Sequence, residues 1–347
     1  MRVALRNRGV QAALASAVLF GAGTPFAKIL LGDVSPWLLA GLLYCGSGLG
    51  LSLIRLIRRA PRVRLSRGEL LPLAGSILFG GVVGPVLLLA GLSNMPASGA
   101  SLLLNAEGVF TALLAWFVFR ENFDRRIALG MAAIVAGAIV ITVPLGVQFG
   151  SPWPALAVLG ACLSWGLDNN FTRMIAHTDA TWLAAVKGAV AGPVNLILAF
   201  SLGAHLPATA HIAGALVVGF FAYGLSLTLF IVGMRHVGTA RAGAYFSVAP
   251  FIGALIALGF GEVVTWPLLI AALLMGGGIW LHLTERHSHE HTHAAHDHSH
   301  MHTHDEHHQH EHPEPVAAGT WHRHEHHHDA ETHDHEHYPD THHRHGH

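Results

Sequence analysis

The chain has 347 residues, of which 52% are hydrophobic and only 12% are charged, and its formal net charge is −1 with histidine neutral. Soluble domains carry about 25% charged residues, so the composition excludes an ordinary soluble protein, and the near-zero charge gives no indication of nucleic-acid binding. Cys45 and Cys162 both lie inside apolar runs, which excludes a disulfide framework and a cysteine metal motif.

Long apolar runs follow one another from Gly9 to Leu283. Runs of about 18 residues or more can cross about 30 Å of hydrocarbon as helices, whereas spanning strands would alternate over about ten residues, and no such alternation is visible. Short connections rich in Gly, Pro, Asn and Ser separate the runs. We therefore predict an all-α membrane protein with ten transmembrane helices, at residues 10–31, 36–57, 70–92, 97–119, 125–144, 153–175, 181–202, 209–233, 239–260 and 264–283.

The first apolar run has one feature of a secretory signal, because arginines within residues 2–8 precede it and small residues lie at 13–15. The run continues to Leu31, however, and further spans follow. We therefore expect it to stay in the protein as a membrane helix.

Basic residues fall at the N-terminus and in alternate loops. They are Arg2, Arg6, Arg8, Arg55, Arg58, Arg59, Arg62, Arg64, Arg67, Arg120, Arg125, Arg126, Arg173, Arg235 and Arg241, and the intervening loops contain neither Lys nor Arg. With ten spans, every basic loop and both termini lie on one side, which the positive-inside rule makes cytoplasmic. We expect a multi-pass protein of the cell inner (plasma) membrane, in contact with lipid, with both termini in the cytoplasm.

The two halves of the apolar region resemble each other in sequence. Residues of the same type and order are Gly21, Phe26, Lys28, Trp37, Phe119 and Glu121 against Gly166, Phe171, Arg173, Trp182, Phe260 and Glu262. Five spans are an odd number, so the halves would enter the membrane in opposite directions, as in transporters with alternating access. We predict a cytoplasmic N-terminus (1–9), two inverted five-helix repeats (10–144 and 153–284) and a cytoplasmic tail (285–347).

The fourth span of each half begins with a stretch of small residues. Residues 97–101 run to Phe119-Arg120-Glu121, and residues 238–242 run to Phe260-Gly261-Glu262. With these motifs, residues 10–284 resemble the EamA-type members of the drug/metabolite transporter superfamily. The resemblance implies ten helices in two repeats and the movement, often outward, of amino acids, metabolites, drugs or other solutes.

The two repeats differ inside that span. The second repeat keeps a proline typical of the family, Pro250, whereas the first has the stretch Asn105-Ala106-Glu107. An acidic residue near the middle of a span costs about 2.5–3.5 kcal/mol on insertion scales and so marks a candidate site. The residues that we predict for a substrate or coupling site are Glu107, Asp168, Asn105, Asn169, Lys187, Arg241 and Tyr245.

Each candidate has a structural alternative. Glu107 could be a proton- or cation-coupling carboxylate, or it could form an ion pair with Lys187 or Lys28 that only holds helices together. Asp168 and Asn169 could line a polar cavity or form a hydrogen-bond cluster between helices. Arg241 could snorkel to the interface, and Tyr245, on the same face, could pack against a neighbour or line the cavity.

Most of the 30 histidines follow Arg286, interleaved with Asp, Glu, Ser and Thr. The segment has no apolar periodicity, so we expect a disordered tail. Neutral imidazole binds Zn, Ni, Cu and Co, and the predicted ligands are His287, His289, His291, His293, His296, His298, His300, His302, His304, His322, His324 and His326. The metal could be sensed, buffered or delivered, or the tail could only be a polar, pH-responsive segment.

The sequence contains no Walker motif and no ordered set of catalytic residues, which argues against ATP drive and against an enzyme. We expect a secondary transporter, an exporter of a small solute, with a divalent transition-metal ion or metal-linked metabolite favoured. Two alternatives stay open: export of amino acids, metabolites or drugs with a tail that only buffers metal or pH, and a membrane metal sensor or chaperone platform without transport. We expect no required cofactor, although the tail can bind Zn, Ni, Co or Cu. The sequence is compatible with a homodimer.

Overall fold

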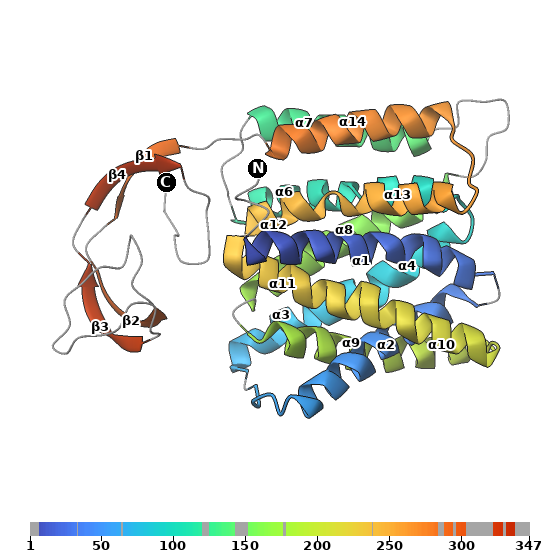
Figure 1. Ribbon diagram of the computed structural model, residues 1–347, viewed down its shortest axis with the longest axis horizontal. Coiled ribbons are helices and arrows are strands. Elements are labelled where there is room, and N and C mark those ends of the chain that lie inside the picture. The colour runs from blue at the N-terminus through green and yellow to red at the C-terminus, as the bar shows by residue number, and fades with distance from the viewer. Residues whose placement is uncertain are drawn as a thin grey trace. The chain divides into compact units, whose positions relative to one another are not determined.

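The computed structural model describes residues 7–32, 34–63, 65–119, 125–142, 152–175, 178–237, 239–283, 288–293, 296–302, 322–328 and 331–336. The chain divides into two units: a helical unit of Met1–Glu285 with Pro339–His347, and a tail unit of Arg286–Tyr338. In the helical unit the long helices lie side by side with their axes in roughly one direction, forming a bundle (Figure 1).

The two halves of the helical unit repeat one order of elements. The first half contains α1 (Arg8–Leu30), α2 (Pro36–Ile57), α3 (Arg67–Ser76), the π-helix η2 (Ile77–Val83), α4 (Gly84–Leu92), α5 (Ala97–Leu103), α6 (Ala106–Phe119) and α7 (Arg125–Thr142). The second half contains α8 (Trp153–Met174), α9 (Ala180–Ser201), α10 (Thr209–Val218), the π-helix η3 (Gly219–Leu225), α11 (Ser226–Val237), α12 (Thr239–Phe246), α13 (Ala249–Gly259) and α14 (Trp266–Leu283).

Each range predicted as a span is helical, and the ends agree within a few residues. The π-helices η2 and η3, and the interruptions between α5 and α6 and between α12 and α13, were not predicted. Both irregularities occur at matching places in the two halves.

Local sequence explains where several helices begin. The Asn7 side chain accepts a hydrogen bond from the Gly9 N–H at 2.8 Å and starts α1. Ser35 caps α2, which has Pro36 in its first turn, where the missing N–H costs nothing. The carboxylate of Asp179 accepts from the Trp182 N–H at 2.9 Å and starts α9.

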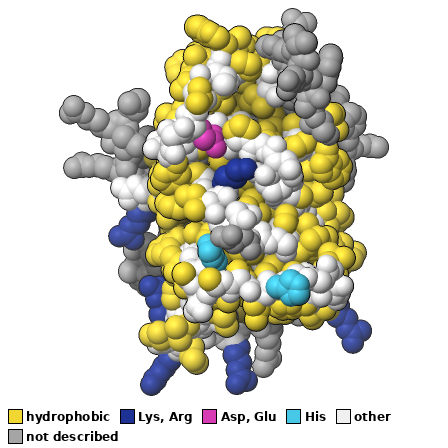
Figure 2. Space-filling model, turned by 90° about the vertical axis from the view of Figure 1, so that its right-hand side faces the viewer, with side chains coloured by type: hydrophobic (Ala, Val, Ile, Leu, Met, Phe, Trp, Pro, Cys, Tyr) yellow, Lys and Arg dark blue, Asp and Glu magenta, His cyan; other side chains and the backbone are white. Residues whose placement is uncertain are grey.

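Hydrophobic side chains cover much of the face of the helical unit that Figure 2 shows. Leu49, Ile57 and Leu71 are 68%, 72% and 77% exposed, which suits contact with lipid. By length and composition, five described helices can cross a membrane: Arg8–Leu30, Pro36–Ile57, Arg67–Leu92, Ala180–Ser201 and Thr209–His236. Three shorter apolar helices are also described, and ten spans stay a prediction.

The strongest packing joins one half to the other: α2 packs on α9, α7 on α14, α1 on α11 and α13, and α8 on α4 and α6. Glycines allow the closest of these approaches. A Cβ on Gly48 would meet the backbone of Gly188, and a Cβ on Gly192 would meet the backbone of Cys45. Small residues bring membrane helices together in this way, so α2 and α9 pack with their backbones in close contact.

The tail unit contains backbone strands where we expected disorder. β1 (Ser288–His293) pairs antiparallel with β4 (Glu331–Glu336), and β2 (His296–His302) pairs antiparallel with β3 (His322–His328). The alternation of His with other polar residues has the period of a strand, and the paired backbone groups satisfy one another. Of the predicted metal ligands, His287 and His304 lie outside the described residues.

Candidate functional site

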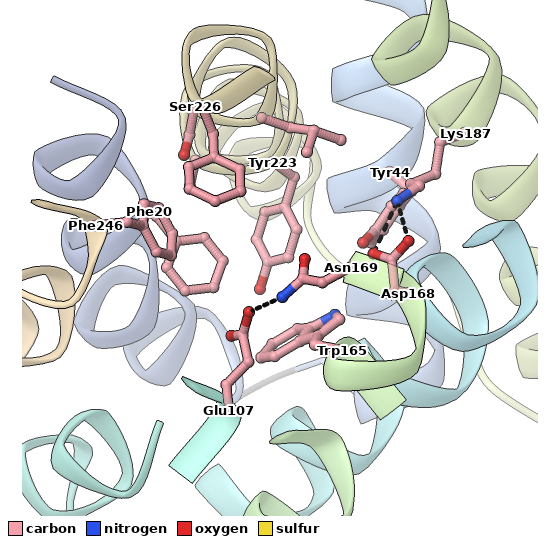
Figure 3. A pocket seen from close by; sticks show the side chains of 13 residues that line it. Phe20, Tyr44, Glu107, Trp165, Asp168, Asn169, Lys187, Tyr223, Ser226 and Phe246 are labelled. Atoms are coloured by element: carbon pink, nitrogen blue, oxygen red, sulfur yellow. Dashed lines mark hydrogen bonds and ion pairs between the residues drawn. The ribbon is translucent and has the colours of Figure 1, made fainter. Parts of the chain in front are cut away.

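One cavity is lined by residues from both halves of the helical unit and contains about 530 Å³ of space that no protein atom fills, part of it open to the outside. Four of the seven predicted site residues line it, namely Glu107, Asp168, Asn169 and Lys187. Figure 3 shows their side chains together with the aromatic residues that complete the wall. The remaining lining residues are Phe20, Tyr44, Trp165, Ala222, Tyr223, Ser226, Leu227, Phe230 and Phe246.

Glu107 projects into this cavity from the first turn of α6. The interruption after α5 makes a helix N-terminus inside the predicted span, and such a terminus stabilises a negative charge. Glu107 Oε1 accepts a hydrogen bond from Asn169 Nδ2 at 2.8 Å, and the same amide lies 3.3 Å from the Thr111 hydroxyl. Within the described residues, the carboxylate of Glu107 therefore has a neutral hydrogen-bond partner and no ion pair.

Asp168 has the opposite environment. Lys187 Nζ donates to Oδ1 at 2.7 Å and to Oδ2 at 2.8 Å, and both side chains are almost fully buried. The Thr172 hydroxyl adds a donor to Oδ1 at 3.0 Å and lies 3.0 Å from the Ser76 hydroxyl. These contacts neutralise the Asp168 charge and tie α8 to α9 and α3.

The two partners that the sequence suggested for Glu107 are engaged elsewhere. Lys187 pairs with Asp168, and Lys28 Nζ donates to the carbonyl of Leu92 at 2.6 Å and to that of Ser93 at 3.3 Å. The structure thus shows a buried ion pair beside the cavity, but on Asp168 rather than on Glu107.

The π-helix η2 packs closely against this ion pair. In a π-turn the backbone hydrogen bonds lose their regular spacing, and carbonyl groups become open to other donors. The Gly80 carbonyl accepts from the Tyr44 hydroxyl at 2.5 Å and from Trp165 Nε1 at 3.2 Å. Gly80 also lies so close to Asp168 that a Cβ there would overlap the carboxylate. Glycine is therefore required where η2 backs the acidic side chain.

Aromatic rings form most of the remaining wall. The centroid distances are 5.7 Å for Phe20–Trp165, 6.1 Å for Phe20–Tyr223, 5.3 Å for Phe20–Phe246, 5.4 Å for Tyr44–Tyr223 and 4.8 Å for Phe230–Phe246. The sequence analysis missed these residues, although Trp165 lies one helical turn before Asn169 and thus on its face.

The other three predicted residues are placed differently. Asn105 is buried at the α5–α6 interruption, where its Nδ2 donates to the Leu102 carbonyl at 3.0 Å and lies 3.6 Å from the sulfur of Met275. Tyr245 is not among the residues that line the cavity, whereas its neighbour Phe246 is. The side chain of Arg241 lies outside the described part of the chain.

Comparison with known protein families matches residues 7–143 and, again, residues 152–284 to the EamA-like transporter family. The chain belongs to this family. An uncharacterized transporter of Methanothermobacter thermautotrophicus is 28% identical over 264 residues, covering 70% of this chain and 76% of the relative. A probable amino-acid metabolite efflux pump of Salmonella typhimurium is 29% identical over 206 residues, covering 55% of this chain and 68% of the pump.

A solved crystal structure shares the fold, with a TM-score of 0.61 and 19% identity over 78% of this chain and 95% of the other. The family and the apolar helices together identify a multi-pass membrane protein of a transporter family, which implies a small-molecule substrate. Family members are transporters, which are not enzymes.

Proposed function

We propose that the protein is a secondary transporter that exports a small solute by alternating access through the cavity between its two halves. The observation that carries the proposal is the placement of Glu107: its carboxylate faces a cavity lined by both halves, and among the described residues its hydrogen-bond partner is the neutral Asn169. A carboxylate in such a place can exchange a proton for a solute. A proton would enter on one side as the solute leaves, and the reverse exchange would reload the site.

The two matches to the family, one in each half, support two repeats of five helices. The matching π-helices and interrupted helices support the same division. We propose that the repeats are inverted, because transporters built in this way place broken helices at the substrate site. We further propose ten spans with both termini in the cytoplasm of the inner membrane, from the distribution of Lys and Arg.

Proteoliposomes test the coupling directly. Purified protein is reconstituted with a pH gradient, and the flux of amino acids, amines and other metabolites is measured with the Glu107→Gln variant in parallel. We expect proton-driven flux in the wild type and its loss in the variant, since an amide cannot exchange a proton at this site. Full proton-driven flux in Glu107→Gln would refute the coupling role.

The histidine-rich tail is proposed as a site for Zn, Ni, Co or Cu that buffers or senses the metal. Its support is chemical, since dense imidazole offers many ligand sets. Transport of a metal ion has less support, because the described lining of the cavity contains neither His nor Cys. Deleting residues 287–347 separates the two: the same metal tolerance and metal uptake without the tail would disconnect it from transport.

A further inference from the structure

The charges around the cavity do not balance. Its described lining contains two carboxylates, Glu107 and Asp168, and one ammonium, Lys187. Lys187 binds both oxygens of Asp168, at 2.7 and 2.8 Å, so this pair contributes no net charge. When ionised, Glu107 therefore leaves the cavity with one uncompensated negative charge, which a substrate with one positive charge would neutralise.

The wall beside Glu107 suits an organic cation. Figure 3 shows the Glu107 carboxylate pointing into the space that Trp165, Tyr223 and Phe20 border. An aromatic face attracts a cation electrostatically, and the same rings accommodate a hydrocarbon group. Carboxylate and rings together therefore match an ammonium that carries an apolar or aromatic substituent.

The same lining disfavours two other kinds of substrate. A cation in the site would bind the carboxylate of an amino acid most strongly, but Lys187, the one Lys or Arg in the described lining, already binds Asp168, and Glu107 would repel that carboxylate. A transition-metal ion prefers several nitrogen or sulfur ligands, and the described lining contains no His or Cys.

We propose that the substrates are amphiphilic amines without a free carboxylate, bound with the ammonium against Glu107 and the apolar group among Phe20, Trp165 and Tyr223. The proposal rests on the proposed transport function. Binding of the amine and of a proton to Glu107 exclude each other, so one proton is released for each amine bound to the protonated site, and acidification weakens binding.

Four probes with the same phenyl ring and two-carbon chain isolate the effect of charge: phenethylamine, phenylethanol, phenylalanine and phenylpropionate. Calorimetric titration of the purified full chain compares their affinities at two pH values. We expect phenethylamine to bind roughly tenfold or more tightly than each of the others, since one ion-pairing contact of about 1.4 kcal/mol corresponds to that ratio. We also expect the affinity for phenethylamine to fall as the pH is lowered, while the affinity for phenylethanol stays constant.

Two variants complete the test. In Glu107→Gln, phenethylamine should lose its advantage over phenylethanol, and unchanged phenylethanol binding shows that the cavity is intact. The matched control is Glu69→Gln, which removes a carboxylate outside the cavity lining and should leave the advantage unchanged. Equal or tighter binding of phenylalanine or phenylpropionate, undetectable binding of phenethylamine, or its full retention in Glu107→Gln would overturn the proposal.

Measurements of solute flux distinguish a wrong substrate class from a wrong transport function. Proton-driven flux of other solutes, without amine binding, would refute the substrate class and leave transport standing. Amine binding without flux of any solute would leave the binding site standing and refute transport.

Discussion

Lys187 Nζ lies 2.7 Å from Oδ1 and 2.8 Å from Oδ2 of Asp168, so one buried ammonium bridges both oxygens of a buried carboxylate. The pair joins α9 to α8 at the edge of the cavity. Removing one partner leaves the other buried without compensation, whereas removing both does not.

The Lys187→Met variant tests this coupling. We expect it to lower the free energy of unfolding by about 3–5 kcal/mol, because Asp168 would stay buried without its counter-ion. The double variant Asp168→Asn with Lys187→Met should recover part of that loss. Unfolding of the purified protein in mixed detergent measures both values, and an additive loss in the double variant would contradict a coupled pair.

Gly80→Ala should destabilise the bundle. The new Cβ would overlap the Asp168 carboxylate, and overpacking of this kind costs about 1–3 kcal/mol. Gly68→Ala is the matched control, because a Cβ at Gly68 meets no atom within 4 Å. Thermal melting of the two variants should show a lower midpoint for Gly80→Ala alone, and equal midpoints would mean that η2 can shift away from Asp168.

Glu262 should stabilise a helix of the opposite half. Its carboxylate oxygens accept hydrogen bonds from the backbone N–H groups of Ala97 at 2.7 Å and Ser98 at 2.9 Å, at the start of α5. Loss of a helix cap costs about 0.5–2 kcal/mol, so Glu262→Ala should lower the free energy of unfolding by that amount. A variant as stable as the wild type would show that water replaces the carboxylate at no cost.

The ion pair between Asp179, the residue that caps α9, and Arg55, in the last turn of α2, is 2.7 Å long and gives a pH dependence at the ends of these helices. Partial burial alone would raise the pKa of Asp179, but hydrogen bonds from the Trp182 N–H and from Arg55, with the Arg55 charge, hold it below its usual value. A carboxyl group with a lowered pKa stabilises the folded state above its unfolded pKa of about 3.9, and this contribution is lost as the pH falls through the folded value.

The matching experiment compares Asp179→Asn with the wild type over a pH series. The midpoints of thermal melting should differ at neutral pH and converge in acid, below the folded pKa of Asp179. A difference that stays constant down to that pH would show that the effect does not come from the charge of Asp179.

Hydropathy and turn residues predicted the helices well, because burial in lipid requires long apolar runs with few charges. The same argument found Glu107, which is conspicuous as an acid inside a span. The pairing of Asp168 with Lys187 could not be predicted, since it depends on how α8 and α9 are rotated against each other. The π-turn at Gly80 and the break at Asn105 were also missed, because neither changes the hydropathy of the run.

Aromatic walls are equally hard to find from sequence, because a phenylalanine that faces lipid and one that faces a cavity look alike. Phe20 and Phe246 come from opposite halves and meet with centroids 5.3 Å apart only once the halves are packed. Tyr245 illustrates the same limit: it was predicted at the cavity, and its neighbour Phe246 lines it instead.

The packing of the helices of each half on helices of the other half has a consequence for the synthesis of the protein. During synthesis α1 and α2 leave the ribosome long before α9, α11 and α13, on which they pack. Until then, the glycine-lined face of α2 lacks the helix on which it packs, and the N–H groups at the start of α5 lack the carboxylate of Glu262. A nascent chain arrested after α7 should therefore be a substrate for membrane quality control, and the two halves, co-expressed as separate polypeptides, should protect each other from degradation.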